Sequence, residues 1–163
     1  MTAGIQADGL RVEYGAFTAV DGVSFRLNAG ETLGLVGESG CGKSTTGLAV
    51  LRMQPVTSGR VIFEGADITA QQARTGTFRR RMQMVYQDPY GSLNPRMNVG
   101  AAIAEPLLIN KLATRTEARD QIAELLRRVG LQPDMASRFP HEFSGGQRQR
   151  ICIARALAVE PRL

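Results

Sequence analysis

The stretch GESGCGKSTT, residues 37–46, is the part of the sequence that decides the fold. Gly37, Gly42, Lys43 and Ser44 in it satisfy the pattern G-x-x-x-x-G-K-[ST]. Glycines let the backbone fold closely around phosphate oxygens, so that successive N–H groups and the start of the next helix point toward negative charge. The lysine reaches the terminal phosphates and the serine hydroxyl reaches Mg²⁺. The stretch therefore predicts a phosphate-binding loop between a strand and a helix.

The segments on either side of the loop have the patterns that this prediction requires. Residues 32–36, TLGLV, are typical of a buried strand, and residues 43–53 are typical of a helix that stops near Pro55. Other short apolar segments alternate with turn residues such as Gly15 and the Asp21–Gly22 pair. We therefore predict further strands at residues 10–14 and 23–27, a hairpin over residues 59–68, and a strand at residues 82–86.

The second half of the sequence changes to helical patterns. Residues 88–98 are dense in turn residues and predict a loop, and helices follow at residues 99–108 and 114–130. The second of these helices has a capping box, Thr114 with Glu117, and Gly130 stands at its C-terminal end. A third helix is predicted from Ser144 to a point before Pro161.

Composition limits the classes of function. The chain has 163 residues, 43% hydrophobic and 21% charged, which indicates a globular domain with a core. Cys41 and Cys152 give no disulfide or metal-site spacing, and no apolar run or N-terminal leader indicates a membrane span, so we expect a soluble chain in a reducing compartment. The net charge of +5 leaves nucleic acid as a minor alternative, and we interpret His141 as a surface or packing residue.

A second motif, FSGGQRQR, occupies residues 143–150. Ser144 and Gln147 have the spacing of a capping box, which taken alone predicts only the start of a helix. Gly145 and Gly146 in the first turn each cost about 1 kcal/mol of helix stability relative to alanine. A second anion site at this helix N-terminus accounts for the two glycines better than a simple cap does.

Together these motifs resemble the nucleotide-binding subunit of an ABC transporter. The first motif matches its Walker A sequence and the second its signature motif, while Gln87 matches the Q-loop glutamine and Tyr14 the aromatic residue that stacks on adenine. From the residues alone, Gln87 is equally a loop residue and Tyr14 a core aromatic. The resemblance implies ATP and Mg²⁺ as cofactors, with Lys43 and Gln87 catalytic, Ser44 and Gln87 at the metal, and ATP bound by Tyr14, Gly37, Glu38, Ser39, Gly40, Cys41, Gly42, Lys43, Ser44 and Thr45.

The fold implied by the resemblance is an α/β P-loop NTPase of the ABC type. It consists of N-terminal antiparallel strands and a parallel core sheet, here incomplete, with an inserted helical subdomain. The chain is then a partial nucleotide-binding domain over residues 1–163. Residues 1–87 are the strand-rich part with the loop, residues 88–143 the helical subdomain, and residues 144–163 the signature helix with the start of a further strand.

Residues 86–107, YQDPYGSLNPRMNVGAAIAEPL, resemble the ATP-binding subunits of dipeptide and oligopeptide importers and of their relatives for glutathione and nickel. The expected partners are permease membrane subunits, a second ATPase subunit, identical or different, in a head-to-tail dimer, and indirectly an extracytoplasmic solute-binding protein. In that dimer Ser144, Gly145, Gly146 and Gln147 act on the partner's ATP. The implied location is peripheral, on the cytoplasmic face of the inner membrane.

One departure from the family pattern concerns catalysis. The Walker B aspartate, the catalytic glutamate and the switch histidine of the family have no counterpart in these 163 residues. We therefore expect the full-length protein to be a transport ATPase, and this chain alone to bind MgATP weakly without hydrolysing it. Two alternatives remain: a non-transport ABC ATPase that acts on nucleic acid or ribosomes, and an inactive truncated product.

Overall fold

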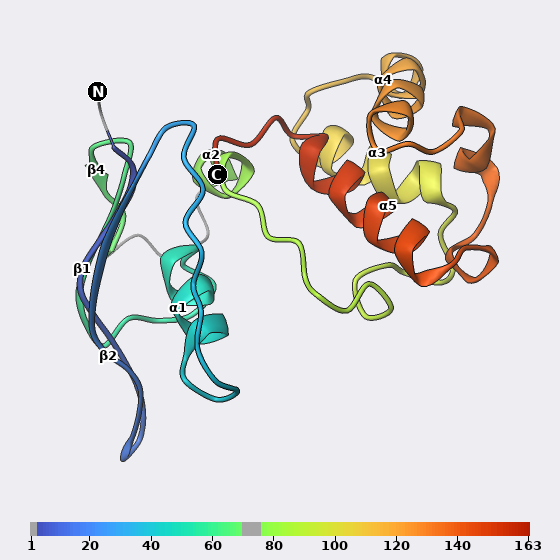
Figure 1. Cartoon of the computed structure of the whole chain (residues 1–163). Helices are drawn as coiled ribbons and strands as arrows, with labels where there is room; N and C mark the ends of the chain where they lie inside the picture. The colour runs from blue at the N-terminus through green and yellow to red at the C-terminus, as the bar shows by residue number, and fades with distance from the viewer. Residues whose placement is uncertain (1–2, 70–75) are drawn as a thin grey trace. The chain divides into compact units, whose positions relative to one another are not determined.

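The computed structural model of the chain describes residues 3–69 and 76–163. They form two compact units, one reaching to Arg79 and including Leu163, the other covering residues 80–162 (Figure 1). The first contains β1 (Ala3–Tyr14), β2 (Phe17–Asn28), α1 (Lys43–Val50), β3 (Ser58–Phe63) and β4 (Ala66–Asp67), and α2 (Gly76–Arg81) crosses the boundary. The second contains α3 (Val99–Ile109), α4 (Arg115–Arg128), η1 (Pro133–Ser137), η2 (Pro140–Glu142) and α5 (Gly145–Leu157).

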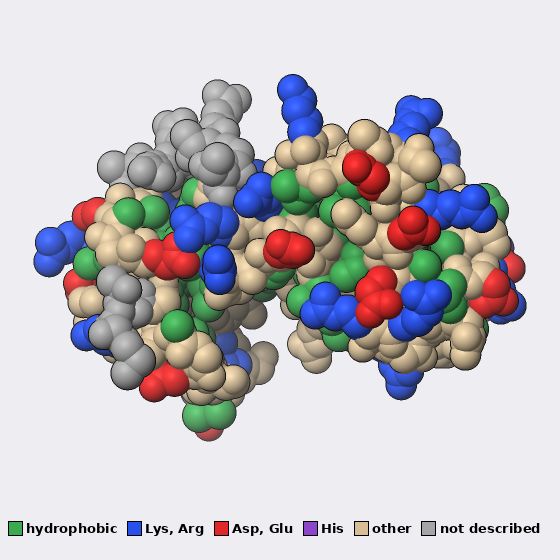
Figure 2. Space-filling model, turned by 90° about the horizontal axis from the view of Figure 1, so that it is seen from above, with side chains coloured by type: hydrophobic (Ala, Val, Ile, Leu, Met, Phe, Trp, Pro, Cys, Tyr) green, Lys and Arg blue, Asp and Glu red, His purple; other side chains and the backbone are tan. Residues whose placement is uncertain are grey.

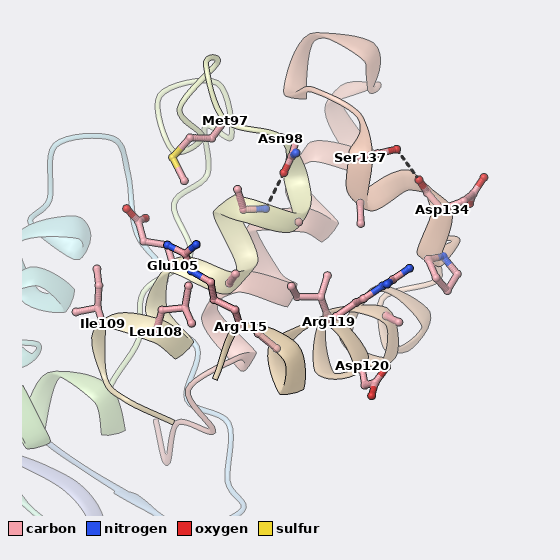
Figure 3. Close-up of a pocket in the computed structure, with 18 residues that line it drawn as sticks. Met97, Asn98, Glu105, Leu108, Ile109, Arg115, Arg119, Asp120, Asp134 and Ser137 are labelled. Carbon is pink, nitrogen blue, oxygen red and sulfur yellow. Dashed lines mark hydrogen bonds between the residues drawn. The ribbon is translucent and has the colours of Figure 1, made fainter. Parts of the chain in front are cut away.

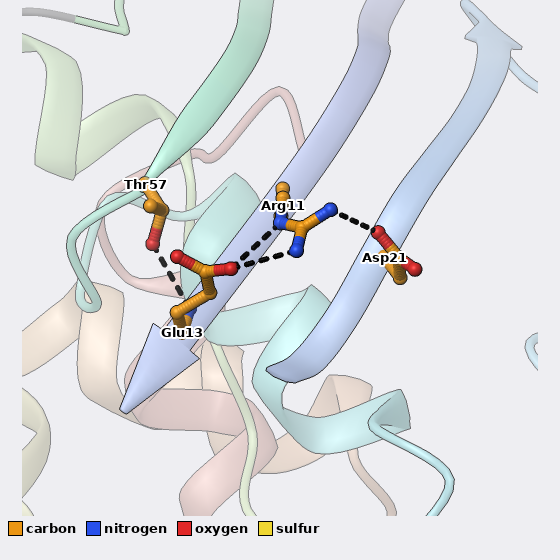
Figure 4. Close-up of polar contacts among 4 residues, drawn as sticks. All are labelled: Arg11, Glu13, Asp21 and Thr57. Atoms are coloured by element: carbon orange, nitrogen blue, oxygen red, sulfur yellow. Dashed lines mark hydrogen bonds and ion pairs between the residues drawn. The ribbon is translucent and has the colours of Figure 1, made fainter. Parts of the chain in front are cut away.

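The strands of the first unit form one antiparallel sheet in the order β2-β1-β3-β4. Buried Ile5, Leu10 and Val12 of β1 belong to its core. On the exposed side, the Arg11 guanidinium lies 2.8 Å from both the Glu13 and the Asp21 carboxylates (Figure 4). Because this cluster is accessible to water, we expect it to add little to stability.

The sequence prediction for the β1–β2 connection is only partly right. The chain turns at Gly15, as predicted, but the Asp21–Gly22 pair lies inside β2 and is not a turn between strands. Leu10 pairs with Val23 and Val12 pairs with Val20, so β2 has one residue more than β1 over this stretch. The Asp-Gly pair therefore marks a β-bulge, which Gly22 accommodates with a φ of 65°.

The strands predicted at residues 32–36 and 82–86 are absent, and these two predictions were wrong. Both segments are irregular chain, and Leu35 and Val36 are 44% and 92% exposed. A buried parallel strand needs hydrogen-bonded neighbours, and no strand among the described residues pairs with either segment. The apolar pattern indicates that these residues favour a strand, but it does not show whether a neighbouring strand is present to pair with them. The hairpin predicted over residues 59–68 is confirmed as β3 and β4.

Three helices, α3, α4 and α5, form the core of the second unit. The fully buried side chains at their interface include Ile103, Leu107, Leu126 and Ile151. The predicted loop and the three predicted helices are confirmed, with Gly130 in a left-handed conformation at the end of α4. No helix within the described ranges 3–69 and 76–163 is both long enough and apolar enough to cross a bilayer.

The capping box of α4 predicts a pH dependence of stability. The Thr114 N–H donates to the Glu117 carboxylate at 2.8 Å and, with the Thr114 hydroxyl, lowers the pKa of this carboxyl. A carboxyl with a lower pKa in the folded state stabilises the protein above its unfolded pKa of about 4.3, and this contribution is lost as the pH falls through the folded value. In urea unfolding from pH 7 to pH 3, Glu117→Gln should therefore lose less stability than the parent chain. Glu124→Gln, which leaves the box intact, should follow the parent.

Candidate nucleotide-binding site

The glycine-rich loop leads directly into α1 in the first unit. Gly42 precedes the helix with a φ of 90°, and its carbonyl oxygen accepts from the Thr46 N–H at 2.8 Å and from the Thr46 hydroxyl at 2.9 Å. A side chain at Gly42 would collide with the carbonyl oxygen of Ala19 in β2. Glycine is thus required here both by the backbone conformation and by the close approach of a strand. The helix ends at Val50, earlier than predicted, because Arg52 takes a φ of 56°.

Lys43 supplies the positive charge of the loop. Its ammonium group donates to the carbonyl oxygens of Gly37 at 2.9 Å and Glu38 at 2.6 Å, and lies 3.4 Å from the Cys41 sulfur. The side chain thus curls back over the loop, where it is partly exposed. A phosphate bound in the loop would offer stronger, charged acceptors in place of these neutral carbonyl oxygens.

The other predicted loop residues lie on the surface near the lysine. Residues 37–41 are exposed, and Ser44, in the first turn of α1, is also exposed, which leaves its hydroxyl open to solvent. The helix N-terminus adds backbone N–H groups and a partial positive charge at the same place. The exposed members of the predicted set are Gly37, Glu38, Ser39, Gly40, Cys41 and Ser44, while Gly42, Lys43 and Thr45 are half-buried.

Tyr14 lies at the end of β1 and is 46% exposed. This exposure excludes the alternative interpretation of Tyr14 as an aromatic residue of the core. Phe17, which the sequence analysis did not single out, pairs with it across the β1–β2 turn and is 63% exposed. Both are exposed aromatic residues at the turn end of the hairpin, and an exposed aromatic ring is a group on which a base can stack. The strand pairing places these two residues opposite each other.

The second predicted group of residues lies in the second unit. Ser144 and Gln147 form the predicted capping box, with a Ser144 N–H to Gln147 Oε1 distance of 2.9 Å. A side chain at Gly145 or Gly146 would meet nothing within 4 Å, so packing inside the chain does not explain these glycines. They line an open pocket of about 570 Å³ together with Gln87, Asp88, Pro89, Tyr90 and Gln149. The structure therefore brings Gln87 together with the signature motif.

Side chains of α5 hold the segment that contains Gln87. The Gln149 amide donates to the Tyr86 carbonyl oxygen at 3.2 Å, and the Arg148 guanidinium lies 4.2 Å from the centre of the Tyr90 ring. Sequence reasoning missed these contacts, because no local pattern relates residues about 60 positions apart. His141 is exposed and stacks on Phe139, which fits its interpretation as a surface residue.

Comparison with known proteins identifies the family. Residues 20–163 match the family described as ABC transporter. The chain belongs to this family. It is 57% identical over 150 residues to the oligopeptide transport ATP-binding protein OppF of Bacillus subtilis, covering 90% of this chain and 49% of that protein. It is 55% identical over 146 residues to the glutathione import ATP-binding protein GsiA of Pectobacterium atrosepticum, covering 89% of this chain and 23% of that protein.

A solved structure of the ABC family supports the fold. A dimeric ATP-binding cassette in a post-hydrolysis state, bound to ADP and Pi, matches with a TM-score of 0.84 and 26% identity, over 96% of this chain and 70% of that one. The predicted ABC-type fold is confirmed, although the described residues include no parallel strand pair. The chain spans about half the length, or less, of the curated relatives above.

Proposed function

We propose that this chain is the nucleotide-binding part of an ATPase subunit that drives an ABC importer for peptides. The observation that carries the proposal is the loop before α1, where the Lys43 ammonium lies over backbone carbonyl oxygens at 2.6 and 2.9 Å. Relatives named for oligopeptide transport and glutathione import, at 50–57% identity, support peptides as the substrate class. A peripheral position on the cytoplasmic face of the membrane follows from this role.

In this proposal the loop binds the phosphates of ATP. The backbone N–H groups of residues 37–45 and the N-terminus of α1 surround the oxygens, and Lys43 exchanges its carbonyl acceptors for the β- and γ-phosphates. Tyr14, with Phe17 beside it, stacks on the adenine. The Ser44 hydroxyl is exposed at the start of α1 and is a hard oxygen donor of the kind that Mg²⁺ prefers, so this residue fits the ion. Mg²⁺ neutralises charge on the phosphates.

The signature residues serve a second subunit. Ser144, Gly145, Gly146 and Gln147 form the start of α5, and the described residues leave the space beside Gly145 and Gly146 open. The N–H groups of Gly145 and Gly146 are suited to close over the γ-phosphate held by another ATPase subunit, identical or different, in a head-to-tail dimer. Those of Ser144 and Gln147 serve the capping box that fixes this helix start. The Gln149 and Arg148 contacts then transmit movement of α5 to residues 86–90.

We propose that the permease contacts this chain at a groove between α3, α4 and η1. The groove has a volume of about 1010 Å³, and Figure 3 shows the side chains that line it. Its floor is formed by small and apolar residues, including Ala101, Ala104 and Leu108, and charged Glu105 and Arg119 lie among the lining residues. An amphipathic helix from a cytoplasmic permease loop fits this combination of an apolar floor and charged groups. The solute-binding protein acts through the permease only.

Nucleic acid is not favoured as the partner. On the face shown in Figure 2, Lys and Arg side chains are interspersed with Asp and Glu and do not form a continuous basic stripe. Binding to nucleic acid depends on such a stripe, because it is driven mainly by neutralisation of consecutive phosphates. The charges on this face therefore give no support to nucleic acid as the partner.

Uptake of a labelled oligopeptide by cells that produce this protein tests the proposal. We expect Lys43→Ala to reduce ATP-dependent uptake to the background of a deletion strain. Lys111→Ala, which removes the other lysine of the chain at an exposed position, should leave uptake intact. Equal uptake of peptides in the parent and the deletion strain would refute the assignment to peptide import.

A further inference from the structure

A second polar pocket lies in the second unit, away from both motifs in the sequence. It has a volume of about 720 Å³. Arginine dominates its lining, which also includes one carboxylate and two apolar side chains. The lining residues are Arg80, Arg81, Arg128, Leu157, Glu160, Pro161 and Arg162.

The four arginines come from three segments that are far apart in the sequence. Arg80 and Arg81 belong to the end of α2, Arg128 is the last residue of α4, and Arg162 follows α5. The Arg162 N–H donates to the Arg81 carbonyl oxygen at 2.7 Å, which joins the first and last of these segments. The fold itself therefore brings four arginines to the lining of one pocket.

This arrangement concentrates positive charge. Four guanidinium groups share the pocket with a single carboxylate, that of Glu160. Among the ion pairs of the described residues, none involves Arg80, Arg128 or Arg162. A row of arginines along one helix is adequately explained as a solvated face, but convergence from three segments places like charges together at an energetic cost. A bound anion would remove that cost.

We propose that this pocket binds a phosphate-bearing anion, either a soluble polyphosphate or the phosphate headgroup of a lipid. Guanidinium groups bind phosphate through paired N–H donors, and several around one pocket can engage more than one phosphate at a time. The exposed chains of Arg80, Arg128 and Arg162 are accessible to such a ligand. The proposal goes beyond the proposed function, because none of these residues belongs to the loop, to the signature motif or to the groove of α3 and α4.

Isothermal titration calorimetry with inorganic pyrophosphate tests whether the pocket binds a soluble polyphosphate; this is the first arm of the experiment. The chain carries Lys43→Ala throughout, so that the loop does not bind the probe. We expect saturable binding that Arg128→Gln or Arg162→Gln weakens by about 10-fold or more, since each removes a charged donor. The second arm tests whether the pocket binds a lipid headgroup. It measures co-sedimentation of the same variants with phosphatidylcholine vesicles that contain or lack phosphatidic acid.

Arg127→Gln is the matched control, because Arg127 precedes Arg128 in α4, is also exposed to solvent and pairs with Glu124 at 3.2 Å outside the pocket. Selective weakening by the Arg128 and Arg162 variants in either arm supports the proposal and identifies the source of the phosphate. Two results overturn it: no binding in both arms, or equal weakening by Arg127→Gln. None of these results bears on ATP binding at the loop.

Discussion

Replacement of Gly42 by alanine is expected to lower the free energy of unfolding by at least about 2 kcal/mol and to weaken ATP binding. Gly42 has a φ of 90°, a conformation that costs any residue with a Cβ about 1–2 kcal/mol. A Cβ would in addition collide with the carbonyl oxygen of Ala19, a backbone atom of β2 that cannot rotate away. Relief of the collision must move either the strand or the start of α1, and with it the loop.

Gly47→Ala provides the matched control for this prediction. Gly47 lies inside α1, five residues further along, and a side chain there would meet nothing within 4 Å. Alanine is the better helix former, so this change should raise stability by up to about 1 kcal/mol and leave ATP binding unchanged. Urea unfolding and a fluorescence titration with an ATP analogue measure both effects. Equal behaviour of the two variants would contradict the account of the loop.

Ile151→Ala should destabilise the second unit by about 3 kcal/mol. The Ile151 side chain is completely buried in the core formed by α3, α4 and α5, so its removal leaves a cavity as well as a loss of apolar contact. Ile153 stands two residues later on the same helix and is 37% exposed. The identical substitution at Ile153 should cost less than about 1 kcal/mol.

Urea unfolding followed by helical circular dichroism measures this difference directly. Because both variants make the same chemical change in α5, helix propensity cancels in the comparison. A cost at Ile153 equal to that at Ile151 would mean that the helical core is not packed as described.

Features that depend on nearby residues could be predicted from the sequence. The capping boxes at Thr114 and Ser144 and the end of α4 at Gly130 all involve residues within four positions of one another. In each case the hydrogen bonds or the backbone conformation that produce the structure involve only the residues of the pattern itself. They were confirmed for that reason.

Features that depend on distant partners could not be predicted in this way. Residues 32–36 have the composition of a buried strand, but a strand also needs a hydrogen-bonded neighbour, which no local pattern reports. The Asp21–Gly22 pair marks a bulge because of the register with β1. The contacts of Arg148 with Tyr90 and of Gln149 with Tyr86 likewise join residues far apart in the sequence.

The most direct test of the central claim is the affinity of the chain for MgATP, measured by calorimetry for the parent, Lys43→Ala and Lys111→Ala. If the loop before α1 binds the phosphates, Lys43→Ala should weaken binding by at least about 10-fold, through the loss of a charged donor. Lys111→Ala should bind as the parent does. Equal affinity of all three proteins for MgATP would contradict the claim that this loop is the nucleotide site.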